Sequence, residues 1–169
     1  MNIGMRAGSR VAVAAVGGLL LSGVGWAETI DCSGTKVSRD RHSESVLLPG
    51  DRPDRKMMQY VRVDVISSPW GEIDGTDQTV LVQQNQTGKM GTSEGFGDFA
   101  LKSGEKLWYK FQATYRILRK GDTWESRYQG IFHFIGGTGR YQGIRGDGHY
   151  QGTVTSGQLS EEFVCTATF

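Results

Sequence analysis

Several features that mark common protein classes are missing from this 169-residue sequence. Beyond residue 27, no segment places apolar residues at a helical period, so we expect few helices or none. No long run of Lys or Arg occurs, and the formal net charge is only +1, which argues against nucleic acid as a partner. The same balance of charges gives no sign of a basic patch that would bind a membrane surface.

Motifs for nucleophilic catalysis and for metal binding are missing as well. No Gly-x-Ser-x-Gly motif occurs. Of the three histidines, His42 lies in a charged segment, while strand parity places His133 and His149 on an outer face. If their strands are neighbours, these two could form a pair on the surface. Glu161 and Glu162 are adjacent in a strand and must face opposite sides, so they cannot form one catalytic pair. We therefore expect no catalytic set, no metal and no cofactor.

The N-terminal segment indicates export. Arg6 and Arg10 precede an apolar run over residues 11–24, and Gly25 and Ala27 are small residues at the positions that signal peptidase reads. The apolar run is shorter than the roughly 20 residues that span a bilayer, which disfavours an uncleaved anchor. We predict a Sec-type signal peptide over residues 1–27, a single domain over residues 28–169, and no stable membrane insertion after cleavage.

The only two cysteines, Cys32 and Cys165, lie near the two ends of the predicted mature chain. An exported protein meets an oxidising compartment, so we expect the two thiols to form a disulfide. Such a bridge closes nearly the whole chain, and chain-entropy reasoning assigns it about 4–5 kcal/mol.

Strict alternation of apolar and polar residues predicts half-buried strands. It is clearest over residues 106–118, and it recurs over residues 57–66, 124–135, 141–155 and 159–169. Over residues 57–66 the valines Val61, Val63 and Val65 face one side, and Arg62 and Asp64 face the other; we expect the apolar parity of each strand to face the interior. For residues 33–55, which are polar, we expect a short strand near residues 45–48 and then an exposed loop. Turn signals separate the runs and favour an antiparallel sandwich or barrel.

Glycine is abundant between residues 136 and 152. Gly136, Gly137 and Gly139 predict a tight reversal, and the later glycines of this segment predict bulges or bends that curve a sheet. A dinucleotide-binding interpretation fails, because position 142 is Gln and no helix follows to hold a pyrophosphate.

Two adjacent segments resemble the turn-and-strand motif of the allene oxide cyclase barrel superfamily, which includes the dirigent proteins. They are YQGIFHFI, residues 128–135, and GGTGRYQGIRG, residues 136–146. The resemblance implies an all-β, closed eight-stranded antiparallel, calycin-like barrel with a central cavity. It also implies a function like that of known members, which act mainly by fixing the conformation of a hydrophobic substrate. Together with the signal peptide it favours a secreted or periplasmic bacterial protein.

Parity identifies the side chains that would enter the lumen of such a barrel. On the predicted strand over residues 124–135, parity also places Trp124 inside the lumen. Glu161 shares the parity of Leu159 and Phe163, so it is either a lumen carboxylate or a rim residue in water, and we favour the rim because charges are seldom buried unpaired. The candidate ligand-binding residues are Tyr109, Phe111, Tyr115, Tyr128, Phe132, Phe134, Tyr150 and Glu161.

Three functions remain open at this point. The first is binding of a small hydrophobic molecule in the lumen. The second is docking of an envelope protein on the outer wall, where Trp108 is expected. The third is a cyclase or isomerase that acts by confinement. A lumen above about 300 Å³ would favour the first and third, and a packed lumen with an apolar patch near Trp108 would favour the second.

Overall fold

The computed structural model describes residues 27–169, which are almost entirely strands and short connections. The predicted signal peptide lies outside this range, apart from Ala27. None of the helical structure within the range is long and apolar enough to cross a membrane. The elements in chain order are β1 (Thr29–Asp31), β2 (Gly34–Leu47), β3 (Arg55–Ser67), β4 (Asp77–Thr87), β5 (Met90–Ala100), β6 (Lys106–Lys120), β7 (Thr123–Gly137), the 3-10 helix η1 (Gly139–Tyr141), β8 (Arg145–Thr155) and β9 (Gln158–Thr168).

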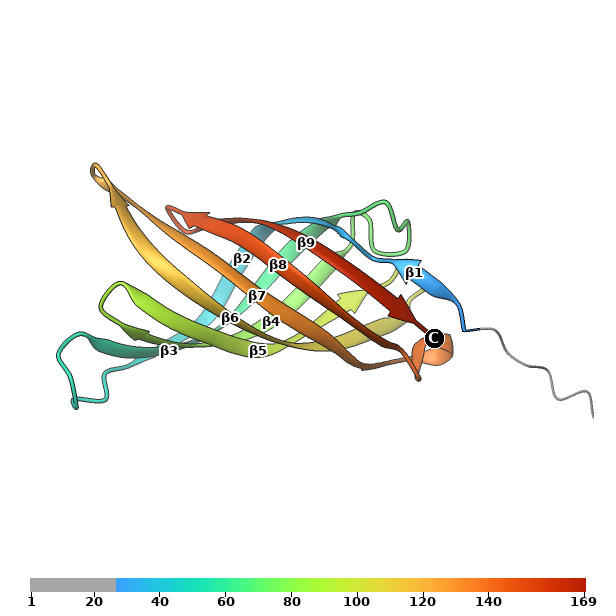
Figure 1. Ribbon diagram of the computed structural model, residues 1–169, viewed down its shortest axis with the longest axis horizontal. Coiled ribbons are helices and arrows are strands. Elements are labelled where there is room, and N and C mark those ends of the chain that lie inside the picture. The colour runs from blue at the N-terminus through green and yellow to red at the C-terminus, as the bar shows by residue number, and fades with distance from the viewer. Residues whose placement is uncertain (1–26) are drawn as a thin grey trace, which may run out of the picture.

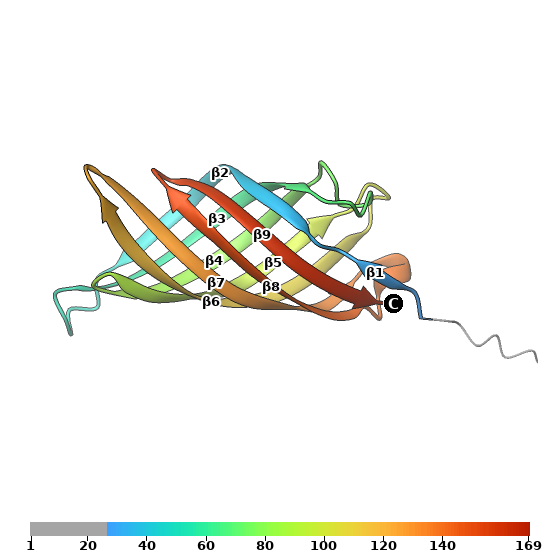
Figure 2. The same cartoon turned by 45° about the horizontal axis from the view of Figure 1, so that its top comes forward.

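Strands β2 to β9 form a closed antiparallel barrel, which confirms the predicted fold class. Each strand pairs with the next along the chain, and β9 pairs back with β2. Strand β1 is an additional strand that pairs with the last three residues of β9. The strands are tilted, and the β2–β3, β4–β5, β6–β7 and β8–β9 hairpins lie at one end of the barrel, with the C-terminus and β1 at the other (Figures 1 and 2).

The end of the barrel that carries the C-terminus is filled by side chains. The ring of Tyr141, from η1, is fully buried and packs 6.2 Å from Trp70 and 4.5 Å from Phe169, measured between ring centroids. A disulfide joins Cys32 and Cys165 beside it, which confirms the predicted pairing. We call this the closed end.

The glycine-rich turn differs from the tight reversal that we predicted. The chain leaves β7 at Gly137 and makes one 3-10 turn before β8. Gly139 has a φ of 55°, and the carboxylate of Glu105 accepts a hydrogen bond of 2.9 Å from the next backbone amide, that of Arg140. The segment is therefore a small cap on the closed end.

Glycines inside the strands also make room for aromatic rings. Gly130 of β7 lies opposite Tyr150 of β8, and a Cβ on that glycine would sit 2.5 Å from the tyrosine Cζ. Gly91 stands in the same relation to Tyr115, 2.5 Å from its hydroxyl. Close approach across the strands, in addition to curvature, explains why these positions are glycine.

Two local predictions are wrong. The first is the length of the strand within residues 33–55. In place of a short strand near residues 45–48 the structure has a strand of 14 residues, β2, with irregularities in its register after Ser38 and after His42, while the exposed loop expected after it is present over residues 48–54. The second half of β2 is exposed because it leaves the barrel wall as a hairpin with β3 (Figure 1). The second is the inward Trp124, which is 46% exposed because the β6–β7 hairpin also extends past the barrel rim.

Candidate functional site

A cluster of charged side chains occupies the middle of the lumen. Lys36 comes from β2, Arg62 and Asp64 from β3, and Glu161 from β9, where it pairs directly opposite Lys36 in the sheet. The Lys36 ammonium lies 2.8 Å from Glu161 Oε1 and 3.9 Å from Asp64 Oδ2. It also donates a hydrogen bond of 2.9 Å to Gln78 Oε1. Two cations and two anions are thus buried together, and their formal charges cancel.

This cluster overturns two of our expectations. On β3 the valines face the outer wall, while Arg62 and Asp64 face the lumen, so the apolar parity of this strand points outward. The valines find apolar neighbours there, since Val61 lies opposite Leu81 and Val65 opposite Val37. Glu161 is not a rim residue in water; it is only 3% exposed, because Lys36 pairs with it.

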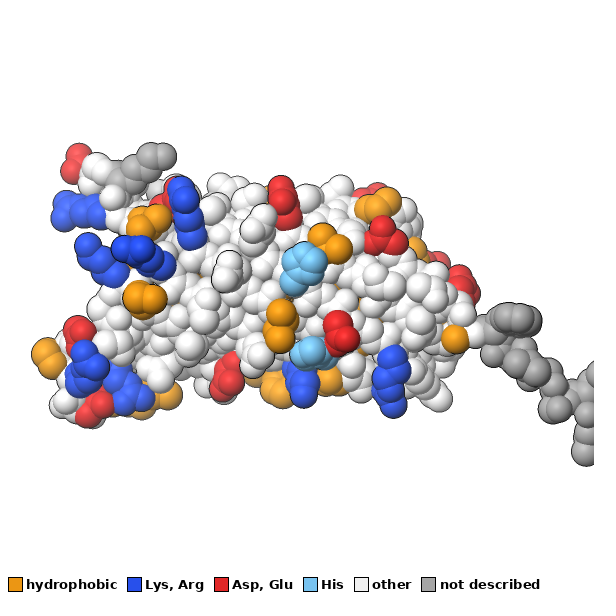
Figure 3. Space-filling model, viewed as in Figure 1, with side chains coloured by type: hydrophobic (Ala, Val, Ile, Leu, Met, Phe, Trp, Pro, Cys, Tyr) orange, Lys and Arg blue, Asp and Glu red, His pale blue; other side chains and the backbone are white. Residues whose placement is uncertain are grey.

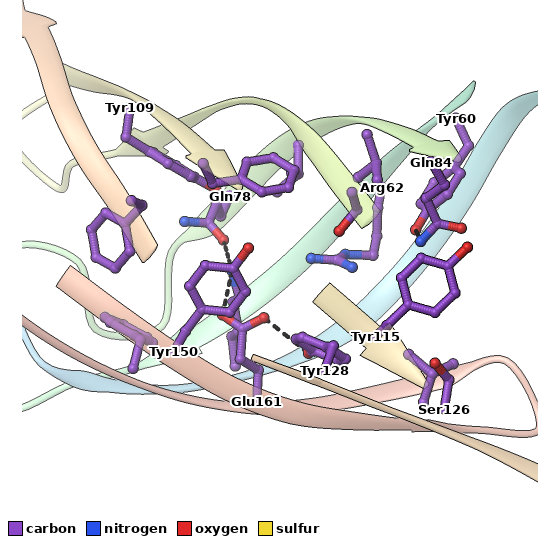
Figure 4. A pocket seen from close by; sticks show the side chains of 18 of the residues that line it. Tyr60, Arg62, Gln78, Gln84, Tyr109, Tyr115, Ser126, Tyr128, Tyr150 and Glu161 are labelled. Atoms are coloured by element: carbon purple, nitrogen blue, oxygen red, sulfur yellow. Dashed lines mark hydrogen bonds and ion pairs between the residues drawn. The ribbon is translucent and has the colours of Figure 1, made fainter. Parts of the chain in front are cut away.

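Arg62 is the member of the cluster that faces free space. Its Nε donates to Asp64 Oδ2 at 2.9 Å, and Asp64 Oδ1, 2.7 Å from the same nitrogen, lies out of line for a hydrogen bond. Burial disfavours the charged guanidinium, but the carboxylates of Asp64 and Glu161 raise the pKa of Arg62 above its usual value. The two Nη groups make no hydrogen bond or ion pair with any described residue and point into the lumen (Figure 4).

Tyrosine hydroxyls surround this cluster. Tyr128 donates a hydrogen bond of 2.9 Å to Glu161 Oε2, and Tyr60 accepts one of 3.1 Å from Gln84. Burial, followed by the nearby charge of Glu161, raises the pKa of Tyr128 and of Tyr150 above the usual tyrosine value. Burial also raises the pKa of Tyr115, to about 12. All of these hydroxyls therefore stay protonated at neutral pH and can donate.

A cavity of about 60 Å³ lies beside the Arg62 guanidinium. It runs toward the hairpin end, where the half-buried side chains of Gln84, Ser126 and Val154 line what we call the mouth. Toward the closed end the lumen is packed by Phe99, Tyr109, Phe132 and Phe163, and the buried Tyr109 hydroxyl has no hydrogen-bond partner among the described residues. The free space is well below the 300 Å³ or more that is typical of ligand pockets.

The structure brings most of the sequence-predicted residues together around this cavity. Phe134 is the exception: it is buried but packs behind Phe99 and Phe132, away from the cavity. The residues lining the cavity that match the prediction are Tyr109, Phe111, Tyr115, Tyr128, Phe132, Tyr150 and Glu161. Sequence reasoning missed Lys36, Arg62 and Gln78; the signal for Arg62 was the polar parity of β3, which could equally have faced solvent.

The histidines lie outside the barrel, as parity predicts. His133 pairs with the carboxylate of Asp147 on the neighbouring strand, and His149 lies opposite Ile131 on the same wall. Among residues 27–169, no group of His, Cys, Asp and Glu has the geometry to hold a metal ion.

We compared the sequence with known proteins. No family model matches the chain, and a search of curated proteins found no similar sequence. The structure alone shows the barrel, and the comparisons do not test the resemblance to the allene oxide cyclase superfamily.

Proposed function

We propose that this barrel binds a small, mainly hydrophobic molecule in its lumen and holds it by an uncharged acceptor oxygen. One observation carries the proposal: a buried, charge-balanced cluster turns the free face of the Arg62 guanidinium toward the cavity. The donors that flank this face, among them Tyr60 and Tyr150, suit an oxygen atom that accepts hydrogen bonds.

Stability alone does not account for four charges in the lumen. Removing two ion pairs from water carries a large desolvation penalty, and apolar residues of similar volume commonly stabilise a protein as well or better. The geometry of Arg62 instead suits a ligand-binding group. Asp64 fixes its Nε, while its two Nη groups face the cavity and have no partner among the described residues.

The charge balance favours a particular ligand chemistry. Lys36 and Arg62 already neutralise Asp64 and Glu161, so a bound carboxylate would leave one net negative charge buried. A carbonyl oxygen accepts the same hydrogen bonds without that penalty. We therefore propose a ketone, ester, lactone or quinone.

The cavity volume limits how the ligand sits. An apolar cavity of about 150 Å³ holds one benzene molecule, and the space beside Arg62 is about 60 Å³. The carbonyl group alone fits there, and the apolar body lies in the mouth against Val154 and the half-buried Ile117. A body of larger size requires Tyr115 or Gln84 to move outward.

This function agrees with the family resemblance, because those barrels hold hydrophobic substrates. We propose membership of the superfamily on the GGTG segment and the barrel together. A signal-directed, periplasmic or secreted location is part of the proposal, and the Cys32–Cys165 disulfide fits it.

The test compares acetophenone with benzoate, which share a ring and differ in charge, by isothermal titration calorimetry on the full chain. We expect acetophenone to bind at least tenfold more tightly than benzoate. The double variant Arg62→Met with Asp64→Asn keeps the charge balance and should lose acetophenone binding. The control variant Lys110→Met, on the exposed outer wall, should keep it. Equal or tighter binding of benzoate, no binding of either probe, or unchanged binding by the double variant would refute the proposal.

A second candidate function, docking of an envelope protein, is favoured by a different observation. Phe96, Trp108 and Ile135 are exposed on adjoining strands of the outer wall, and the lumen is nearly filled. Native mass spectrometry of the chain purified from its own envelope tests it. A complex of fixed stoichiometry that is lost in Trp108→Ser supports docking, and a chain that stays free of protein in every preparation opposes it.

A further inference from the structure

The end of the barrel that carries the four hairpins has an unusual surface. Antiparallel pairing places the β2–β3, β4–β5, β6–β7 and β8–β9 connections at this one end, opposite the closed end (Figure 1). Three of these hairpins expose large apolar side chains: Val46, Leu47, Leu48 and Met57 on the first, Met90 on the second and Trp124 on the third. Leu48 is 71% exposed, the highest value among the large apolar residues of the described chain.

Basic residues gather on the same end. The hairpin end contains nine Lys and Arg residues and five Asp and Glu residues, counted over residues 41–58, 84–92, 114–128 and 153–160. Over the rest of the described chain, eight Lys and Arg residues stand against 13 Asp and Glu residues. The formal charge is therefore +4 at this end and −5 elsewhere. Figure 3 shows the blue side chains crowded at the hairpin end, with orange ones between them.

Several of these cations are not neutralised by neighbours. Arg55 pairs with Asp51 at 2.6 Å, and Arg127 with Glu125 at 2.5 Å. Lys56, Lys89 and Arg116, in contrast, form no ion pair with any residue of the described range. Lys89 and Arg116 lie close together, because the amide of Ile117 donates to the carbonyl of Lys89.

We propose that the hairpin end docks onto a lipid bilayer that contains anionic headgroups. Apolar side chains at the tips would enter the interface, and the surrounding cations would meet the lipid phosphates. A lipid surface fits better than an acidic protein, because the apolar residues stand on separate projecting hairpins (Figure 2). They form no continuous flat patch of the kind that protein interfaces bury.

This proposal departs from our expectation of no basic membrane patch, which considered only runs of basic residues along the sequence. The cations come from segments around residues 41–56, residue 89 and residues 116–127, and none of these is a basic run by itself. The barrel gathers them at one end. Docking in this orientation would turn the mouth of the lumen toward the membrane, but the proposal does not depend on ligand binding.

The test measures binding of the full chain, recovered from a bacterial envelope, to sedimented vesicles. Vesicles of phosphatidylcholine with phosphatidylglycerol are compared with phosphatidylcholine alone, at low and high salt. We expect binding to the anionic vesicles only, weakened by salt. Quenching of Trp124 by brominated lipid reports insertion of the β6–β7 tip in the chain that lacks residues 1–27, because Trp70 and Trp108 lie away from this end and Trp26 is removed with the signal peptide.

Matched variants locate the surface. Lys89→Gln with Arg116→Gln should lower the partition coefficient about 25-fold, at about fivefold for each cation. Leu47→Ser with Leu48→Ser should lower it about tenfold. The controls Lys102→Gln with Lys110→Gln, and Val164→Ser, remove exposed groups elsewhere and should change it less than twofold. Absence of binding, equal binding to both vesicle types, or equal losses in the controls would overturn the proposal.

Discussion

Removing Lys36 from the buried cluster tests whether the four charges act as a unit. In Lys36→Met, Glu161 loses the cation that lies 2.8 Å from its Oε1, and Asp64 loses a second one at 3.9 Å. Arg62 then faces two carboxylates, one of which is uncompensated and largely buried. Breaking a buried pair in this way costs about 3–5 kcal/mol of stability.

The reverse change, Glu161→Gln, leaves Lys36 in excess and should cost a similar amount. It also replaces the carboxylate that accepts the Tyr128 hydroxyl by a neutral amide, which can still accept that bond. The double variant Lys36→Met with Glu161→Gln retains the balanced Arg62–Asp64 pair. We expect the loss of unfolding free energy in the double variant to be smaller than the sum of the two single losses by at least about 2 kcal/mol.

Urea unfolding at neutral pH, with the disulfide intact, measures these values. The exposed pair between Arg39 and Asp77, 2.7 Å apart, is the control, and Arg39→Gln should cost less than about 1 kcal/mol. The reasoning about the buried cluster is wrong if the losses of unfolding free energy in the two single variants simply add in the double variant. It is also wrong if Lys36→Met costs no more stability than Arg39→Gln.

Two further predictions follow from the lumen. Gly130→Ala places a methyl group against the Gln112 carbonyl and the Tyr150 ring and should destabilise the barrel by about 1–3 kcal/mol. Gly143→Ala should not, because apart from its chain neighbours no atom of the described residues lies within 4 Å of its Cβ; thermal unfolding compares the two variants. All six tyrosines have a pKa above the usual value of 10.0, with burial as the first cause. The folded state then binds more protons than the unfolded state above about pH 10, so the tyrosine contribution to stability should be fully present below that pH and be lost as the pH rises above it. An alkaline absorbance titration that finds folded tyrosines ionising with a midpoint near pH 10 would contradict this.

The aromatic half of the lumen could be predicted from sequence because its strands have one apolar face and one polar face. On β6, Tyr109 and Tyr115 alternate with Lys110 and Thr114, so only one orientation buries the rings, and the structure has that orientation. The disulfide was predictable for a different reason, since Cys32 and Cys165 had no other partner.

The charged half could not be predicted, because a single strand does not show what its polar face will meet. Arg62 and Asp64 would be unfavourable inside an otherwise apolar barrel. They are stable there because Lys36 and Glu161 arrive from two other strands, 26 and 97 residues away from Arg62 and Asp64 respectively in the chain. The parity of β3 is decided by these long-range partners, and alternation carries no information about them.

The lumen is therefore divided along the barrel axis. Near the closed end, Phe99, Phe132 and Phe163 pack against one another beside the disulfide, and changes there should act on folding. Toward the hairpins, tyrosine hydroxyls and the Arg62 guanidinium surround free space, and the rim beyond them is basic and apolar. A barrel whose only role was structural would gain stability by filling that second half with apolar side chains, as it does the first. The chain instead keeps a charged cluster in the middle of the lumen, on the side that opens toward the exposed apolar tips, and for this physical reason we propose a ligand site there.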